Sequence, residues 1–226
     1  MQPYFFPYIG YWQLINAVDV FVIYDNIQYT KKGWINRNRF LQNGKDAVFS
    51  ISLKRDSNFL DVKDRIISGD FNKIKLLNKI KEAYKKAPYF DQVFFLFKKV
   101  VLSNDNNLFT YIFFSIKEIC KYLTIDTKLI KSSDIDINHG LKSQDKVLAI
   151  CQNIGTNVYI NAIGGKELYS KELFSEQGID LKFIKTESII YNQFDKQFVP
   201  WLSIIDVMMF NNQEEISKML HDYQLI

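Results

Sequence analysis

The sequence predicts an α/β protein with a mainly parallel, Rossmann-like sheet flanked by helices and a helical insert at about 70–123. Two observations lead to this prediction. After residue 127, strand and helix patterns alternate with short connections, which is typical of a parallel sheet. In addition, the apolar run DVFVIYD at 19–25 shows little alternation of polar and apolar residues, which indicates a strand covered on both faces.

The first third of the chain contains two predicted strands and a polar segment between them. A short helix is expected at 12–17, followed by the strand at 19–25 and a second strand at 46–53. The intervening residues, 26–45, are polar, basic and rich in Asn. Because they are too irregular for a core element, we expect them to form a loop.

Three helices are expected in the insert. The first, at 72–87, has apolar residues three or four positions apart and ends before Pro88, since the residue before a proline disfavours helical backbone. The second and third are expected at 89–102 and 107–123, with the same periodicity. We interpret them as an insertion into one α/β domain that spans residues 1–226.

The second half supplies the remaining strands and helices. Strands are expected at 128–132, 157–161 and 180–185, and helices at 143–153, 167–177 and 202–210. Gly155 and Gly178 lie just beyond two of these helices, where glycine commonly ends a helix. The sequence IGGK connects the strand at 157–161 to the helix that follows.

Composition excludes several classes of protein. The 226 residues are 47% hydrophobic, and 29 basic residues against 25 acidic ones give a net charge of +4, which is too small to indicate a nucleic-acid-binding protein. Cys120 and Cys151 follow apolar residues within predicted helices, so we expect buried thiols in a reducing compartment. No zinc-ligand spacing, signal peptide or membrane span is apparent, which predicts a cytoplasmic protein.

The densest group of candidate ligand-binding residues directly follows the strand at 19–25. Open parallel sheets bind ligands at the carboxyl ends of their strands, and Arg, Lys and Asn can pair with phosphates and sugar hydroxyls. The alternative is a solvated basic loop around one packed Trp. The candidates are Asp25, Gln28, Trp34, Asn36, Arg37, Asn38 and Arg39.

Three further segments contain candidates, each with a structural alternative. Tyr8 belongs to an aromatic N-terminal loop that either packs into the core or forms a wall for a ligand. His139 lies in the loop between a strand and a helix and could be catalytic or only exposed. Residues after the strand at 157–161 could bind an anion at a helix start or simply form that start. The last group comprises Asn161, Gly164, Gly165, Lys166 and Tyr169.

A shared site is predicted from the position of these residues. Each lies at or just beyond the carboxyl end of a predicted strand, where a parallel sheet opens its ligand crevice. We therefore expect residues that are distant in sequence to converge on one concave site. The members of this predicted site are Asp25, Asn36, Arg37, Asn161 and Lys166.

Long strings across the chain resemble the WbqC-like protein family. They are QPYFFPYIGYWQLI, DVFVIYDNIQYTKKGWINRNRF, YINAIGGKELYSKELFSEQGIDLKFI and FVPWLSIIDVMMFN, and they occur in the family's order. The resemblance is weakest at about 56–126. Members of the family begin with several apolar strand residues before the Gln-Pro pair, whereas here Met1 directly precedes Gln2. This departure implies a missing or shortened first strand.

A more distant similarity concerns the first strand, loop and helix of nucleotidylyl-transfer enzymes of the pantothenate synthetase type. Residues 6–24 resemble that arrangement, and Gly10 matches the glycine of its His-x-x-Gly-His-type loop. Both histidines of the loop are replaced in this chain. Because those histidines hold phosphates in the transition state, the similarity implies a related fold but not nucleotidyl transfer.

The family resemblance implies a role in bacterial O-antigen or other surface-polysaccharide biosynthesis, as an acyl or aminoacyl (glycine-type) transferase acting on a nucleotide-linked amino sugar. In that reaction we expect His139, with Asp25 as second choice, to act as base. Arg37, Arg39 and Lys166 suit the diphosphate, and Trp34 could stack on a ring. The alternative is a protein that binds a nucleotide-sugar or glycan without catalysis. The sequence indicates no particular cofactor.

Overall fold

The computed structural model describes residues 1–194 and 197–226. Its α-helices are α1 (Ile9–Asn16), α2 (Lys73–Tyr84), α3 (Phe90–Val101), α4 (Leu108–Tyr122), α5 (Ser143–Ile154), α6 (Lys171–Glu176), α7 (Ile204–Phe210) and α8 (Gln213–Met219). The strands are β1 (Val20–Ile23), β2 (Arg37–Gln42), β3 (Lys45–Ser50), β4 (Lys128–Lys131), β5 (Val158–Ala162), β6 (Asp180–Thr186) and β7 (Tyr223–Leu225). Short 3-10 helices are η1 (Val62–Asp64), η2 (Ser132–Asp134) and η3 (Ile163–Leu168).

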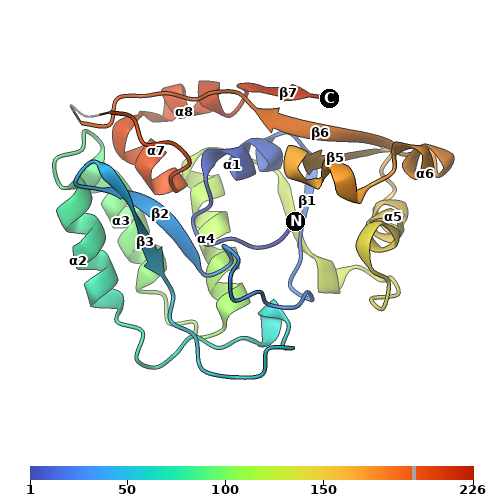
Figure 1. Ribbon diagram of the computed structural model, residues 1–226, viewed down its shortest axis with the longest axis horizontal. Helices are drawn as coiled ribbons and strands as arrows, with labels where there is room; N and C mark the ends of the chain where they lie inside the picture. Colours follow the sequence, from blue (N-terminus) through green and yellow to red (C-terminus); the bar gives the residue numbers. More distant parts are fainter. Residues whose placement is uncertain (195–196) are drawn as a thin grey trace.

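The strands form three small sheets (Figure 1). β1 pairs with β4 and β5 pairs with β6, both in parallel, whereas β2–β3 and β6–β7 are antiparallel. The predicted α/β class is therefore confirmed. A continuous Rossmann-like sheet is not, because parallel pairing among the described residues is limited to these two pairs of strands.

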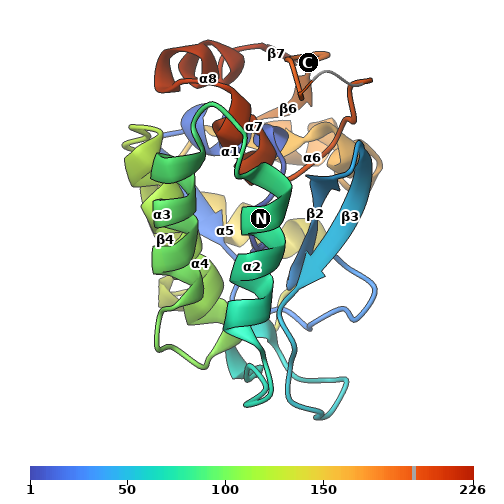
Figure 2. The ribbon, with the colours of Figure 1, turned by 90° about the vertical axis from the view of Figure 1, so that its left-hand side faces the viewer.

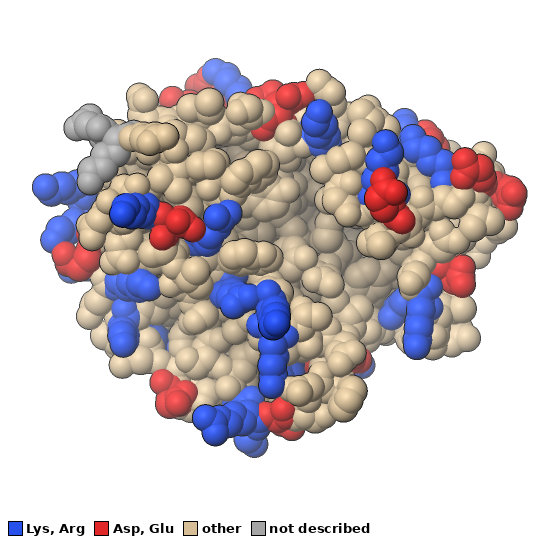
Figure 3. Space-filling view, in the orientation of Figure 1, with Lys and Arg blue, Asp and Glu red and all other residues tan. Residues whose placement is uncertain are grey.

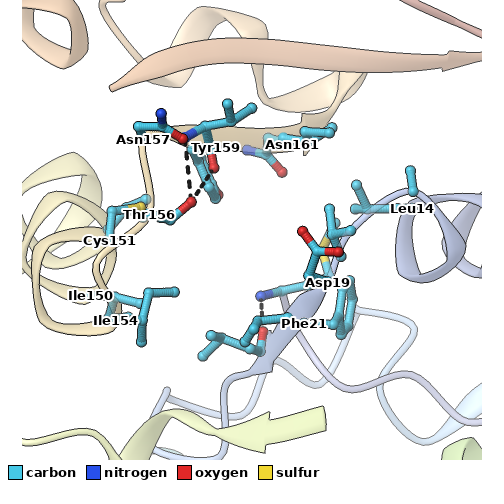
Figure 4. Close-up of a pocket in the computed structure, with 18 of the residues that line it drawn as sticks. Leu14, Asp19, Phe21, Ile150, Cys151, Ile154, Thr156, Asn157, Tyr159 and Asn161 are labelled. Atoms are coloured by element: carbon cyan, nitrogen blue, oxygen red, sulfur yellow. Dashed lines mark hydrogen bonds between the residues drawn. The ribbon is translucent and has the colours of Figure 1, made fainter. Parts of the chain in front are cut away.

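A cavity separates the two parallel pairs. β1 and β5 each have a strand on one side only, and both border a cavity of about 520 Å³ (Figure 4). The Met1 amine donates a hydrogen bond to the Val22 carbonyl oxygen at 2.7 Å, and the Tyr24 N–H donates to the Met1 carbonyl oxygen at 2.8 Å. Met1 thus continues the parallel pattern for one residue. Beyond it, residues of both β1 and β5 line the cavity.

The three helices of the insert lie close to their predicted positions. In Figure 2, α2, α3 and α4 stand side by side, with the β2–β3 hairpin next to α2. The side chains of Asn72 and Asn107 accept hydrogen bonds from the first turns of α2 and α4, which satisfies backbone donors at each helix start. Residues three or four apart on each helix are buried, so the apolar periodicity in the sequence marks the faces that form the core.

The aromatic N-terminal loop packs mainly into the core. Phe5, Phe6 and Trp12 are buried, and the Phe6 backbone has a left-handed φ of 47°. The Asn38 amide donates to the carbonyl oxygens of Phe5 and Phe6, at 3.3 and 2.9 Å, and the Ser203 hydroxyl donates to Phe6 at 2.7 Å. Of the two interpretations of this loop, packing holds for most of it, while Tyr4 and Tyr8 remain partly exposed.

The segment predicted as a loop at 26–45 contains a strand. β2 pairs with β3 through a two-residue turn at Asn43 and Gly44, both with positive φ, which is the turn that Asn-Gly favours. The sequence did not indicate this strand because one of its buried positions is filled by a polar residue, Asn38. That side chain is buried because it bonds to the N-terminal loop.

No helix among residues 1–194 and 197–226 is both long and apolar enough to cross a lipid bilayer. The longest, α4, has 15 residues.

The cavity between β1 and β5 generates a prediction about stability. We expect five apolar, β-branched residues placed directly before Met1 to pair with both free edges and raise Tm by at least about 4 °C, which corresponds to about 1–2 kcal/mol in a protein of this size. The extension also removes the Met1 amine, whose pKa burial lowers to about 5. Thermal melting checks this. A Gly-Ser extension of equal length is the control, and equal melting temperatures for the two extensions would contradict the prediction.

Candidate functional site

The carboxyl ends of β1 and β4 meet at one edge, where a polar cluster is formed. The register pairs Ile23 with Lys131, so the residues that follow each strand are neighbours. Asp25 and Asn26 follow β1, and Ser132 and Ser133 begin η2 after β4. In the orientation of Figure 1, β1 runs through the middle of the molecule, and the surface there is hollowed between the β2–β3 side and the β5–β6 side (Figure 3).

Asp25 is the buried centre of this cluster, with 3% of its surface exposed. Its carboxylate accepts hydrogen bonds from the Ser132 hydroxyl at 2.9 Å, the Ser133 N–H at 3.0 Å and the Ser133 hydroxyl at 2.5 Å. Burial would raise the pKa of Asp25, but these donors outweigh it and hold the pKa below its ordinary value. The carboxylate is therefore ionised and already occupied, which suits it to fixing the serines rather than to accepting a proton.

Asn26 joins the cluster to a cation. Its Oδ1 atom lies 2.6 Å from the Ser132 hydroxyl and 3.2 Å from Lys146 Nζ. Lys146, on α5, is 8% exposed, and its ammonium lies 5.4 Å from the centre of the Tyr24 ring. Burial lowers the pKa of Lys146, and the carboxylates of Asp61 and Asp25 oppose that shift. Lys146 thus places a largely desolvated positive charge beneath the edge of the sheet.

The same contacts set the orientation of His139. Because an ammonium can only donate, Lys146 requires that the Asn26 oxygen, and not its NH2 group, face it. The NH2 group then faces Nδ1 of His139 at 2.9 Å, so Nδ1 accepts and the proton of the neutral ring lies on Nε2. His139 is exposed and presents an N–H donor to the surface. This differs from the expected role as a base, which needs an unprotonated nitrogen facing the substrate.

The predicted candidates in the basic segment mostly bind the protein itself. Asn36 donates to the Ile51 carbonyl oxygen and accepts from Tyr29, and Asn38 holds the N-terminal loop. Gln28, an exposed residue, donates to the Asn58 carbonyl oxygen. These three amides therefore fix loop geometry.

Trp34 is the most exposed aromatic of this segment, and two arginines flank it. The guanidinium carbons of Arg37 and Arg39 lie 5.5 and 5.7 Å from its ring centre. Arg37 donates to the backbone carbonyl oxygens of Gly33 and Lys32. Arg39 donates to the Trp201 carbonyl oxygen and lies 3.5 Å from Asp46. This stack combines an exposed flat ring with two positive charges, which suits a flat ring or an anion as ligand.

The candidates after β5 form a separate group. The Asn161 side chain accepts from the Ala162 N–H, and its Nδ2 atom lies where a side chain on Gly165 would be. Tyr169 packs edge-on against Tyr159 and Phe174. Gly164 and Lys166 are exposed on η3. No hydrogen bond within residues 1–194 and 197–226 joins this group to Asp25 or to Asn36, so the predicted convergence of all five residues stays a prediction.

A second cavity, of about 500 Å³, lies beyond the carboxyl end of β6. Its aromatic wall is formed by Tyr8, Tyr191, Phe198 and Trp201, and the rings of Tyr8 and Trp201 lie 5.8 Å apart. Trp201 is exposed and has a left-handed φ of 60°, an unfavourable conformation for a bulky residue. Tyr8, predicted as a ligand contact, is thus in a concave site that does not contain Asp25 or His139.

Sequence reasoning did not single out Asn26, Ser132, Ser133 or Lys146. The strand-end rule that selected Asp25 applies equally to Asn26 and Ser133, which directly follow predicted strands, and to Ser132, the last residue of the strand expected at 128–132. Lys146 gave no such signal, because a lysine on an amphipathic helix is usually solvated.

Comparisons with known proteins identify one family and one relative. The model of the WbqC-like protein family matches residues 2–218. An uncharacterised protein of Mycobacterium tuberculosis is 26% identical over 215 residues, which are 93% of this chain and 91% of that protein. No solved structure matches the chain.

The Asp25 cluster predicts a pH-dependent stability. Asp25→Asn removes acceptors from buried donors and is expected to lower the free energy of unfolding by about 2–4 kcal/mol at pH 7. Because the folded-state pKa of Asp25 is lowered, its contribution is complete above the unfolded value of about 3.9 and is lost as the pH falls through the folded value. Urea unfolding from pH 7 to 3 should show the difference from the parent shrinking. The exposed Asp134→Asn is the matched control, and a difference that grows on acidification would contradict the assignment.

Proposed function

This chain belongs to the WbqC-like protein family, and we propose that it transfers an acyl or aminoacyl group, of the glycine type, to the amine of a nucleotide-linked amino sugar. The reaction is placed at the carboxyl ends of β1 and β4. The product would enter the O-antigen or another surface polysaccharide, the pathway that the family resemblance implies.

The observation that carries the proposal is the polar cluster of Asp25, Ser132, Asn26, Lys146 and His139, in which the single hydroxyl proton of Ser132 lies between the side-chain oxygens of Asp25 and Asn26. It gathers a buried cation and an exposed N–H donor at one sheet edge, which is where parallel strands place ligands. A nucleotide-linked sugar has a diphosphate for the cation, and acyl transfer develops an oxyanion for the donor.

Each residue has a distinct role in this proposal. Attack of the sugar amine on the carbonyl carbon of the acyl thioester forms a C–N bond and moves negative charge onto the carbonyl oxygen. The C–S bond then breaks as the carbonyl re-forms, and the leaving thiolate takes up the proton that the nitrogen loses. The Nε2–H of His139 donates to that oxygen, and Asn26 holds the ring in the required tautomer. Lys146 stabilises negative charge near the edge. Because the carboxylate of Asp25 is occupied, the amine must bind in its unprotonated form.

The alternative, binding of a nucleotide-sugar without catalysis, is favoured by one specific observation. Neither Asp25 nor the Nδ1 atom of His139 is well placed for proton transfer, since the buried carboxylate is held by three donors and the single lone pair of Nδ1 accepts from Asn26. A site that only holds its ligand needs no base. The two functions differ in whether a new covalent product appears.

Mass spectrometry distinguishes them. The purified chain is incubated with a UDP-linked amino sugar and a glycyl or acetyl thioester, and the sugar nucleotide is examined for the added mass. We expect a product with the parent, and about 10²-fold slower formation with His139→Ala, because one oxyanion donor is lost.

His221→Ala is the matched control, because His221 is also exposed, in the turn after α8, and contacts Asn16. Its rate should equal that of the parent. Binding of the sugar nucleotide without any product would contradict the transferase and support the alternative. A product formed equally fast by His139→Ala would remove the role assigned to His139.

A further inference from the structure

The aromatic cavity beyond β6 is not used by the proposed function. It measures about 500 Å³, a volume typical of sites for small organic molecules. The rings of Tyr8 and Trp201 lie 5.8 Å apart at 62°, and those of Tyr191 and Phe198 lie 5.1 Å apart at 79°. Because each pair is closer to edge-to-face than to stacked, it presents ring faces in two directions.

Trp201 is held at the cavity in an unfavourable conformation. The residue is 61% exposed, and its φ of 60° is left-handed, which bulky residues rarely adopt. β2 fixes this backbone, since Arg39 donates to the Trp201 carbonyl oxygen at 3.1 Å and the Ser203 N–H donates to the Arg39 carbonyl oxygen at 2.8 Å. Strain of this kind clusters at ligand sites, so the exposed ring indicates a ligand contact.

The neighbouring rings are supported from within the protein. A Cβ atom on residue 10 would lie 2.5 Å from the Tyr8 ring, so glycine at this position lets the ring pack against the start of α1. The Tyr191 hydroxyl donates to the buried Asp206 carboxylate at 2.7 Å. Gln193 donates to the same carboxylate at 2.6 Å and bonds twice to the backbone of Val199. A wall fixed in this way lowers the entropic cost of binding a ligand.

The charge around the cavity is mainly negative. Of the described residues that line it, only Glu187 is charged, and none of the ion pairs within the part of the chain that the structure describes involves Glu187. Asp206 is a second carboxylate behind the aromatic wall; burial raises its pKa, and its three donors oppose that shift. The cation Arg39 meets Trp201 at its backbone and lies 3.5 Å from Asp46, so its charge is partly balanced.

These surroundings favour an organic cation as ligand. Aromatic ring faces carry negative partial charge and attract ammonium groups, and a carboxylate adds a direct attraction. An anionic ligand, such as a sugar nucleotide, would be repelled by Glu187, and a neutral ring would gain nothing from that charge. A metal ion is not favoured, because no group of three or more His, Cys, Asp or Glu residues that could hold one occurs among the described residues.

We propose that the cavity lined by Tyr8, Tyr191, Phe198, Trp201 and Glu187 binds a small organic cation of the quaternary ammonium type. The ring faces contact its alkyl groups, and Glu187 supplies the opposite charge. The inference goes beyond the proposed function, because its ligand differs in charge from a sugar nucleotide and involves no acyl transfer.

Titration calorimetry with choline, at ionic strength balanced with NaCl, tests the site in the full chain. The matched ligand is 3,3-dimethylbutan-1-ol, which has the shape of choline but no charge. We expect saturable binding of choline to the parent and at least about tenfold weaker binding of the alcohol. Phosphocholine, the lipid headgroup that adds a phosphate to the same cation, should also bind more weakly than choline, since Glu187 repels the phosphate.

Two substitutions locate the site. Trp201→Ala should weaken choline binding at least about tenfold and Trp201→Phe less, because phenylalanine keeps a ring face, while Glu187→Gln should weaken it about fivefold. Phe95→Ala and Glu176→Gln are the matched controls, since both residues are exposed on other helices, and they should bind as the parent does.

Thermal melting shows whether each variant is folded, and Trp201→Phe retains the test if Trp201→Ala does not fold. The proposal would be overturned if the parent did not bind choline, if the alcohol or phosphocholine bound as tightly as choline, or if folded Trp201 variants bound like the parent. Because no acyl donor is present, failure of the proposed transfer does not affect this result.

Discussion

A buried carboxylate, Asp25, joins the ends of the two parallel strands β1 and β4, and the proposed site depends on it. Its three donors come from consecutive residues, Ser132 and Ser133, so the start of η2 is fixed relative to the end of β1. This arrangement places the Ser132 hydroxyl next to Asn26. The Asn26 side chain in turn orients His139 and accepts a hydrogen bond from Lys146. The chemistry assigned to the surface therefore originates in a hydrogen-bond network below it.

The buried carboxylates and the buried cations described here both have neutral hydrogen-bond partners. A second buried carboxylate, Asp206, accepts from the hydroxyls of Tyr84 and Tyr191 and from the Gln193 amide, so it too is satisfied by neutral donors. Lys146 and Arg65 are buried cations that contact neutral acceptors and aromatic rings. Neither cation belongs to an ion pair within the described residues, so positive charge remains available near the edge of β1 for an anionic ligand.

Sequence patterns predicted the helices whose buried faces follow from regular apolar spacing. They predicted the residues of the candidate site only in part. The helices α2, α3 and α4 were predictable because apolar spacing fixes which face is buried. β2 was not, because Asn38 is buried through bonds to a loop more than 30 residues earlier. Asp25 and His139 could be selected from their positions after and between strands, but the tautomer of His139 depends on Asn26 and Lys146.

Hydrogen–deuterium exchange of the full chain, with and without UDP-glucosamine, tests the location of the site most directly. If the ligand binds at the carboxyl ends of β1 and β4, exchange should slow in peptides that cover 25–29, 60–66 and 132–146 and remain unchanged at 186–191 and 198–202. Slowing confined to 186–191 and 198–202, which line the aromatic cavity beyond β6, would contradict the central claim and place the ligand there.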